Sequence, residues 1–183
     1  MGVVIMNKLV PTFHILSQLG MFFALLILMP TVVSYVYEDD AFPVFWHTAA
    51  ISELLFFLIW LLCRKRQHEL RPRDGFSLVV MLWLGFACIA ALPFYYYFPE
   101  MSFTDAFFEA MSGLTTTGAT VISGLDTLPP SINFWRHMLN WLGGMGIIVL
   151  AVAILPMLGV GGTQLFKAEI AGVHKDKTSP RIS

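Results

Sequence analysis

The sequence has few charged residues. Asp, Glu, Lys and Arg together make up 13% of its 183 residues, whereas a soluble domain has roughly a quarter. Hydrophobic residues make up 57%. This composition excludes an ordinary soluble domain and predicts an all-α integral membrane protein, whose length is best counted in spans of about 20 residues.

The sequence also lacks the motifs of several chemistries. Its two cysteines, Cys63 and Cys88, lie in apolar runs, which indicates packing rather than a disulfide or a metal site. It contains no His-Glu-x-x-His motif and no nucleotide-binding fingerprint, and its first apolar run is too long for a signal peptide and has no clear cleavage site. We therefore predict no enzymatic activity, no organic cofactor and no nucleic-acid partner.

An intramembrane enzyme would need a buried nucleophile with a base, or paired carboxylates. Ser112 has no histidine nearby in its loop, and Glu53 has no obvious partner carboxylate. A charged residue inside a span is costly if unpaired, so Glu53 has either a structural partner or a role in a proton relay. An enzyme remains the weakest hypothesis.

Four apolar segments are long enough to cross a bilayer. Pro30 is expected to kink the first or to mark its outer end. Tyrosine and tryptophan side chains near the ends of the segments are typical of the membrane interface. The segments run over about Leu9–Val36, Val44–Cys63, Phe76–Phe98 and Phe134–Leu158.

Basic residues predict the orientation. All but Arg136 of the eleven Lys and Arg residues lie near the start, between Arg64 and Arg73, or in the tail after residue 159. Most of the acidic residues that flank the spans lie in the connections on the opposite side of the membrane. The positive-inside rule therefore places both ends and the loop from Arg64 to Arg73 in the cytoplasm.

The connection from Pro99 to Ile132 is neither a polar loop nor a fifth span. Ser102 and Asp105 predict a helix cap, and apolar residues follow at helical spacing. About eleven residues at 1.5 Å each reach only about halfway through the hydrocarbon. We expect this helix to end near Gly113 and the chain to return to the outer surface by Pro129-Pro130, which describes a re-entrant loop.

The run from Thr115 to Thr120 follows this short helix. Its composition is typical of ion filters, which need small residues, carbonyl oxygens turned toward an axis and one position free to take a positive φ. Gly118 supplies such a position. The sequence therefore predicts that the protein conducts a cation, against the alternative of a packing loop between helices.

Three motifs together resemble one family. They are Phe-Glu-Ala-Met-Ser-Gly-Leu-Thr-Thr-Thr-Gly-Ala-Thr at 108–120, Trp-Leu-Gly-Gly-Met-Gly at 141–146 and Gly-Val-Gly-Gly-Thr-Gln-Leu-Phe-Lys-Ala-Glu at 159–169. The chain resembles the Trk/Ktr/HKT superfamily of potassium transporters, most closely the bacterial TrkH family.

The resemblance implies a domain organisation. Residues 1–75 would form two leading transmembrane helices with a basic cytoplasmic loop, and residues 76–158 the first M1-pore loop-M2 repeat, with a pore helix at about 102–113 and a filter at 115–120. Residues 159–183 would be a cytoplasmic segment leading to three further repeats. Either the chain is part of a longer protein, which the leading helices favour, or several copies assemble.

The resemblance also implies roles for individual residues. The carbonyls of Thr116, Thr117 and Gly118 would bind potassium, and Thr116 could add its hydroxyl. Residues Thr115, Ala119, Thr120 and Glu109 would support the filter, and residues Gly143, Gly144 and Gly146 would allow close helix packing.

The residues leave two charge questions open. Asp105 and Glu109 form either an outer acidic collar that concentrates cations, or a helix cap and a hydrogen bond to the filter backbone, respectively. Arg136 either reaches to the interface or pairs with Asp126 or Glu109.

By resemblance the function is potassium uptake across the bacterial inner membrane. The complete transporter would be a homodimer in membrane lipid, gated by a cytosolic nucleotide-binding subunit of the TrkA type. The alternative is a truncated, non-conducting module that assembles with or regulates full-length subunits.

Overall fold

The computed structural model describes residues 2–64 and 72–157, and the side chains of residues 10–64 and 75–149. The predicted tail segment 159–183 and most of the basic loop lie outside the described residues. The chain divides into two compact units, residues 1–145 and 146–183. The described part of the chain is helical and contains no strand.

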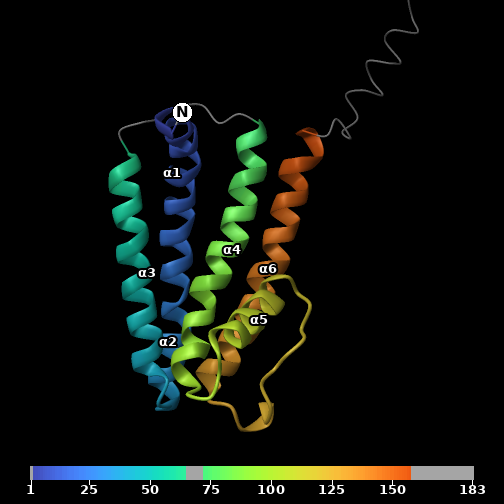
Figure 1. Ribbon diagram of the computed structural model, residues 1–183. Coiled ribbons are helices and arrows are strands. Elements are labelled where there is room, and N and C mark those ends of the chain that lie inside the picture. The colour runs from blue at the N-terminus through green and yellow to red at the C-terminus, as the bar shows by residue number, and fades with distance from the viewer. Residues whose placement is uncertain (1, 65–71, 158–183) are drawn as a thin grey trace, which may run out of the picture. The chain divides into compact units, whose positions relative to one another are not determined.

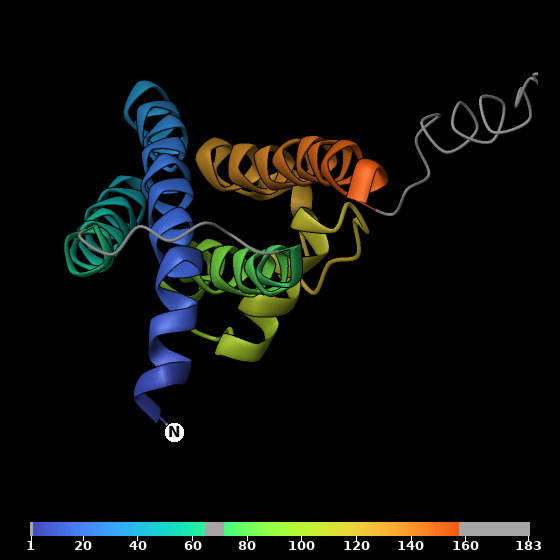
Figure 2. The same cartoon turned by 90° about the horizontal axis from the view of Figure 1, so that it is seen from above.

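The first unit contains three long helical segments, which lie beside one another (Figures 1 and 2). α1 packs against both α3 and α4, and α5 packs against α4. The elements are α1 Gly2–Leu26, α2 Leu28–Tyr37, α3 Phe42–Cys63, α4 Pro72–Tyr97, α5 Phe103–Leu114, the 3₁₀ helix η1 Leu125–Thr127 and α6 Pro130–Met157, which begins in the first unit.

Three of the four predicted spans are confirmed by helix length and composition in the described residues. They are Val10–Tyr37, Phe42–Cys63 and Gly75–Tyr97. α6 is a continuous helix of 28 residues, but it is not among the described helices that meet this composition. Its crossing of the membrane remains a prediction.

The first span is interrupted near Pro30, as the sequence predicts. Proline has no N–H to bond the carbonyl of residue i−4, and its ring clashes with that carbonyl. For Pro30 this is residue Leu26, where α1 ends, and α2 resumes at Leu28. Across the break, the Ile27 N–H donates to the carbonyl three residues back, that of Ala24, at 3.2 Å.

The core of the first unit is built around Trp135 of α6, which is fully buried. Its ring lies edge-on to Phe45 of α3 and tilted to Phe23 of α1, with centroid distances of 6.2 and 6.1 Å. Its indole N–H donates to the Ala90 carbonyl of α4 at 3.1 Å. One side chain thus joins the first turns of α6 to three other helices.

Small residues let α5 approach its neighbours closely. Ala87, Ala90 and Ala91 of α4 and Ala106 and Ala110 of α5 are all fully buried. Alanine at such positions removes side-chain bulk between helix backbones. The candidate site begins where α5 ends, at Leu114.

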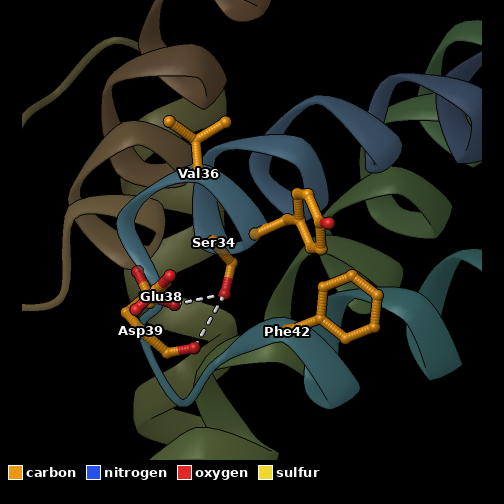
Figure 3. Close-up of a pocket in the computed structure, with 6 residues that line it drawn as sticks. Ser34, Val36, Glu38, Asp39 and Phe42 are labelled. Carbon is orange, nitrogen blue, oxygen red and sulfur yellow. Dashed lines mark hydrogen bonds between the residues drawn. The ribbon is translucent and has the colours of Figure 1, made fainter.

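The corner between α2 and α3, together with the α4–α5 link and η1, lies at one end of the first unit (Figure 1). Asp39 in this corner accepts hydrogen bonds from the Ser34 hydroxyl and the Ala41 N–H, the latter at 3.2 Å. Asp40 accepts one from the Tyr97 hydroxyl of α4 at 2.9 Å. Figure 3 shows Ser34 and Asp39 facing each other beside an open surface pocket of about 460 Å³.

Candidate functional site

α5 begins at the predicted cap. The Ser102 hydroxyl accepts a hydrogen bond from the Asp105 N–H at 3.2 Å and donates to the Asp105 carboxylate at 2.7 Å. Asp105 therefore serves the helix N-terminus, where a negative charge is favourable. This geometry matches the capping alternative for Asp105.

α5 ends at Leu114, one residue beyond the end predicted near Gly113. The residue in the left-handed conformation is Thr116, with φ of 58°, and not the glycine. The N–H of Thr116 donates to the Gly113 carbonyl and that of Thr117 to the Ser112 carbonyl, both at 2.9 Å. This is the bonding pattern of a Schellman motif. A β-branched residue in this conformation is strained by about 1–2 kcal/mol.

Gly113 is required for packing instead. A Cβ at this position would lie 2.9 Å from the Cβ of Leu139 in α6, closer than real side chains approach. The periodic pattern around Gly113 could not reveal this, because the contact joins two helices that are remote in sequence.

Residues 115–121 form an exposed, non-helical segment after α5, which we call the extended segment. Gly118 has a φ of 74°, as predicted, and nothing lies within 4 Å of where its Cβ would be. In Figure 1 this segment leaves the C-terminal end of α5 and runs back toward η1. Two of its hydroxyls form a hydrogen bond with each other, since those of Thr115 and Thr117 lie 2.8 Å apart.

The backbone carbonyls of this segment fall into two groups. The Ala119 carbonyl accepts a hydrogen bond from the Ser112 hydroxyl at 2.6 Å. Within residues 10–64 and 75–149, the other carbonyls of the segment, those of Thr116, Thr117 and Gly118 among them, accept no hydrogen bond from protein. Backbone carbonyls are obligatory acceptors, so these three oxygens are available to water or a cation.

Glu109 fixes the far part of the segment. Its side chain is buried, and one carboxylate oxygen accepts from the Thr120 hydroxyl at 2.8 Å and the Val121 N–H at 3.1 Å. The other oxygen pairs with the Arg136 side chain of α6 at 2.7 Å. Glu109 thus bonds the backbone, and Arg136 pairs with Glu109 rather than with Asp126.

The glycines of α6 lie at unequal distances from the segment. A Cβ at Gly143 would overlap the backbone carbonyl of Leu114 at the end of α5. A Cβ at Gly144 would make ordinary contact with a Thr116 methyl at 3.8 Å. Gly146 belongs to the second unit. Gly143 therefore sets how closely α5 and α6 approach.

Glu53, Cys63 and Cys88, which the sequence also singles out, are not part of this site. Glu53 of α3 is partly buried, and its Oε2 atom has no hydrogen-bond partner in the described part of the chain. Cys63 and Cys88 are free thiols. In the described residues, no group of three or more His, Cys, Asp and Glu side chains could hold a metal ion.

Sequence reasoning missed two contacts. One is the Ser112–Ala119 bond, which the position of a serine one turn before the threonine run could have suggested. The other joins Asp39 to the N–H of Ser131 at 3.0 Å, across 92 residues. Local patterns carry no signal for a contact of that separation.

Comparisons with known proteins give a consistent result. The TrkH family model, described as "Cation transport protein", matches residues 41–183. The chain is 48% identical over 172 residues to the Trk system potassium uptake protein TrkH of Escherichia coli strain K12, which covers 93% of this chain and 36% of that protein. It is 41% identical over 176 residues to the Trk system potassium uptake protein TrkG of the same strain, with the same coverage.

A solved structure agrees with the sequence relatives. The crystal structure of the potassium transporter TrkH from Vibrio parahaemolyticus matches with a TM-score of 0.77 and 45% identity, and covers 91% of this chain and 35% of that one. The chain spans about a third of the length of the relatives it matches. Since the family model covers most of the sequence and the fold agrees, the chain belongs to the TrkH family of cation transport proteins.

Proposed function

We propose that this chain supplies one wall of a potassium pathway, and that the carbonyls of Thr116, Thr117 and Gly118 bind the ion. The observation that carries the proposal is that these three residues are exposed and that their carbonyls accept no hydrogen bond from protein in the described residues. A potassium ion loses its hydration shell only where other oxygens replace it. The names of the relatives, potassium uptake proteins, agree with this ion.

In this proposal α4, α5 and α6 are the M1, pore-helix and M2 elements of one repeat over residues 76–158. α5 has 12 residues, so it is about 18 Å long and too short to cross a hydrocarbon core of about 30 Å. Its C-terminal end lies next to the three carbonyls. The helix dipole places partial negative charge there, which favours a cation.

One wall cannot surround an ion. We propose that three further repeats complete the ring, in a longer polypeptide whose other parts correspond to the remaining length of the relatives. Measuring potassium flux in proteoliposomes tests this point. We expect the isolated 183-residue chain to give no flux, and robust flux from it would require several copies to assemble instead.

We further propose that both ends of the chain face the cytoplasm of a bacterial inner membrane. In support, Arg64 follows α3, whereas Asp39, Asp40 and Asp126 lie in the connections at the opposite end of the first unit. A homodimer and a cytosolic nucleotide-binding subunit of the TrkA type are proposed from family resemblance alone.

Gly118 offers the sharpest test. Gly118→Ala adds a Cβ that would contact nothing within 4 Å, but the φ of 74° disfavours any side chain. The relaxed backbone would turn carbonyls away from the ion. In the transport-competent assembly we expect the potassium-to-sodium permeability ratio to fall about tenfold or more, which corresponds to about 1.4 kcal/mol of differential binding.

Gly124→Ala is the matched control. Gly124 has a nearly equal φ of 72°, but it lies in the turn before η1. This variant carries similar backbone strain, and its Cβ would also lie 3.2 Å from the Thr127 hydroxyl; it should keep the selectivity of the unchanged protein. Unchanged selectivity in Gly118→Ala, or an equal loss in both variants, would remove Gly118 from the ion pathway.

A further inference from the structure

Asp39 makes a contact that neither the family assignment nor the proposed filter uses. It lies in the corner between α2 and α3, and its Oδ2 atom accepts a hydrogen bond from the Ser131 N–H at 3.0 Å. Its Oδ1 atom accepts from the Ala41 N–H and from the Ser34 hydroxyl. Both carboxylate oxygens are therefore occupied, and the carboxylate is held in one orientation.

Ser131 is in the first turn of α6, directly after Pro130. The residue is fully buried, and Asp39 is the acceptor of its N–H in the described residues. The first N–H groups of a helix have no partner within the helix, and the positive end of the helix dipole attracts a carboxylate. Asp39 therefore acts as the cap of α6 from a different part of the chain.

The start of α6 is anchored by three elements within two turns. Ser131 is held by the α2–α3 corner, Trp135 by the Ala90 carbonyl of α4, and Arg136 by Glu109 of α5. Glu109 in turn holds the backbone of the extended segment at Val121. A contiguous series of contacts thus runs from Asp39 through α6 to the residues that follow the three free carbonyls.

We propose that Asp39 is a positioning residue for ion selectivity: the α2–α3 corner sets the place of α6, and through Arg136 and Glu109 the place of the extended segment. This inference rests on the proposed function of that segment. It gives the two leading helices a task in transport beyond crossing the membrane. A coupling of this kind needs a measured energetic effect and not only spatial continuity.

A different role for this corner would be to attract cations by charge. Glu38 and Asp39 border the open pocket of Figure 3. Glu38 is exposed, and it forms no hydrogen bond through its side chain in the described residues. A charge effect would therefore be shared by Glu38 and Asp39, whereas positioning depends on Asp39 alone.

The test uses Asp39→Asn in the transport-competent assembly that contains this chain. Asparagine has the same shape and can keep the bond from the Ala41 N–H, but it then presents an N–H₂ group to the Ser131 N–H. We expect the potassium-to-sodium permeability ratio to fall roughly threefold or more, within the range of effects at a distance. Glu38→Gln and Asp40→Asn, which remove the same charge, should match the unchanged protein.

Ser34→Ala provides a second, milder variant. It removes only the hydroxyl that orients the Asp39 carboxylate, and we expect a smaller loss of selectivity in the same direction. This variant decides the matter if Asp39→Asn does not reach the membrane. Combining Asp39→Asn with Glu109→Gln should lower selectivity by less than the product of the two single effects, because both act on one series of contacts.

The outcomes separate the two proposals. If the unchanged assembly shows no preference for potassium, the proposed function itself fails. If it is selective and both Asp39→Asn and Ser34→Ala equal it, only the positioning role of Asp39 is overturned. Equal losses in Glu38→Gln and Asp39→Asn would indicate a surface-charge effect and would also overturn that role.

Discussion

At the residue scale, Glu109 is the buried acidic side chain that holds the far end of the extended segment. Its carboxylate is buried, which costs several kcal/mol unless the charge is paired and hydrogen-bonded. Arg136 supplies the opposite charge, and Thr120 and Val121 supply two donors. The Glu109 carboxylate can therefore stay charged and buried only while the extended segment and α6 keep these partners in place.

Removing this charge should destabilise the fold. Glu109→Gln leaves Arg136 with an unpaired charge on a side chain that is only 13% exposed. We expect a loss of about 3 kcal/mol in the free energy of unfolding, at the lower end of the range for breaking a buried pair. Denaturant unfolding in detergent measures this value.

The double variant Glu109→Gln/Arg136→Gln is the control for Glu109→Gln. It removes both charges, so no buried charge remains unpaired, and it should recover part of the lost stability. A double variant that loses the sum of the two single effects would show that the two residues do not act as a pair.

At the element scale, the approach of α5 to α6 depends on Gly143. A side chain there would overlap the Leu114 backbone, and backbone cannot move aside as a flexible side chain can. We expect Gly143→Ala to destabilise the protein by about 1–3 kcal/mol, as overpacking does. The midpoint of thermal unfolding measures the change.

Gly144→Ala is the neighbouring control for Gly143→Ala. Its Cβ would meet only the Thr116 methyl, at an ordinary contact distance of 3.8 Å, and alanine favours a helix by about 1 kcal/mol over glycine. This variant should be neutral or slightly stabilising. Equal effects at both glycines would contradict the close contact between Gly143 and Leu114.

The elements that sequence predicts well are those with local causes. The Ser102 cap needs only residues three apart, and the break near Pro30 follows from proline geometry. The end of α5 is predicted to within one residue, but the left-handed residue could not be predicted, because two neighbouring threonines give no sign of which takes that conformation. The pairing of Arg136 with Glu109 is one of three alternatives in the sequence, beside reaching the interface and pairing with Asp126, because the choice depends on how α5 and α6 pack.

At the scale of the whole first unit, Asp39 links the leading helices to α6 and makes stability depend on pH. Burial alone would raise the pKa of this carboxyl, but hydrogen bonds from Ser34, Ser131 and Ala41 outweigh burial and lower the pKa from its ordinary value of 3.8. A lowered pKa stabilises the folded state fully above the ordinary value. That contribution is lost as the pH falls below 3.8 toward the lowered pKa.

Unfolding midpoints between about pH 6 and about pH 3 measure this dependence. The neighbouring groups Glu38, Asp40 and Tyr97 also lie at this end of the unit, so the comparison with Asp39→Asn isolates Asp39. We expect the unchanged protein to lose more stability than Asp39→Asn over the acid part of this range. Parallel curves for the two proteins would assign the acid sensitivity to other carboxyls.

The central claim concerns where the ion binds. Thallium is a monovalent cation similar in size to potassium, and its anomalous scattering can locate it in crystals of the complete transport-competent assembly. We predict a thallium peak beside the carbonyls of Thr116, Thr117 and Gly118, which excess potassium displaces and equal sodium does not. A peak bound only at other residues, with none along these three carbonyls, would contradict the account.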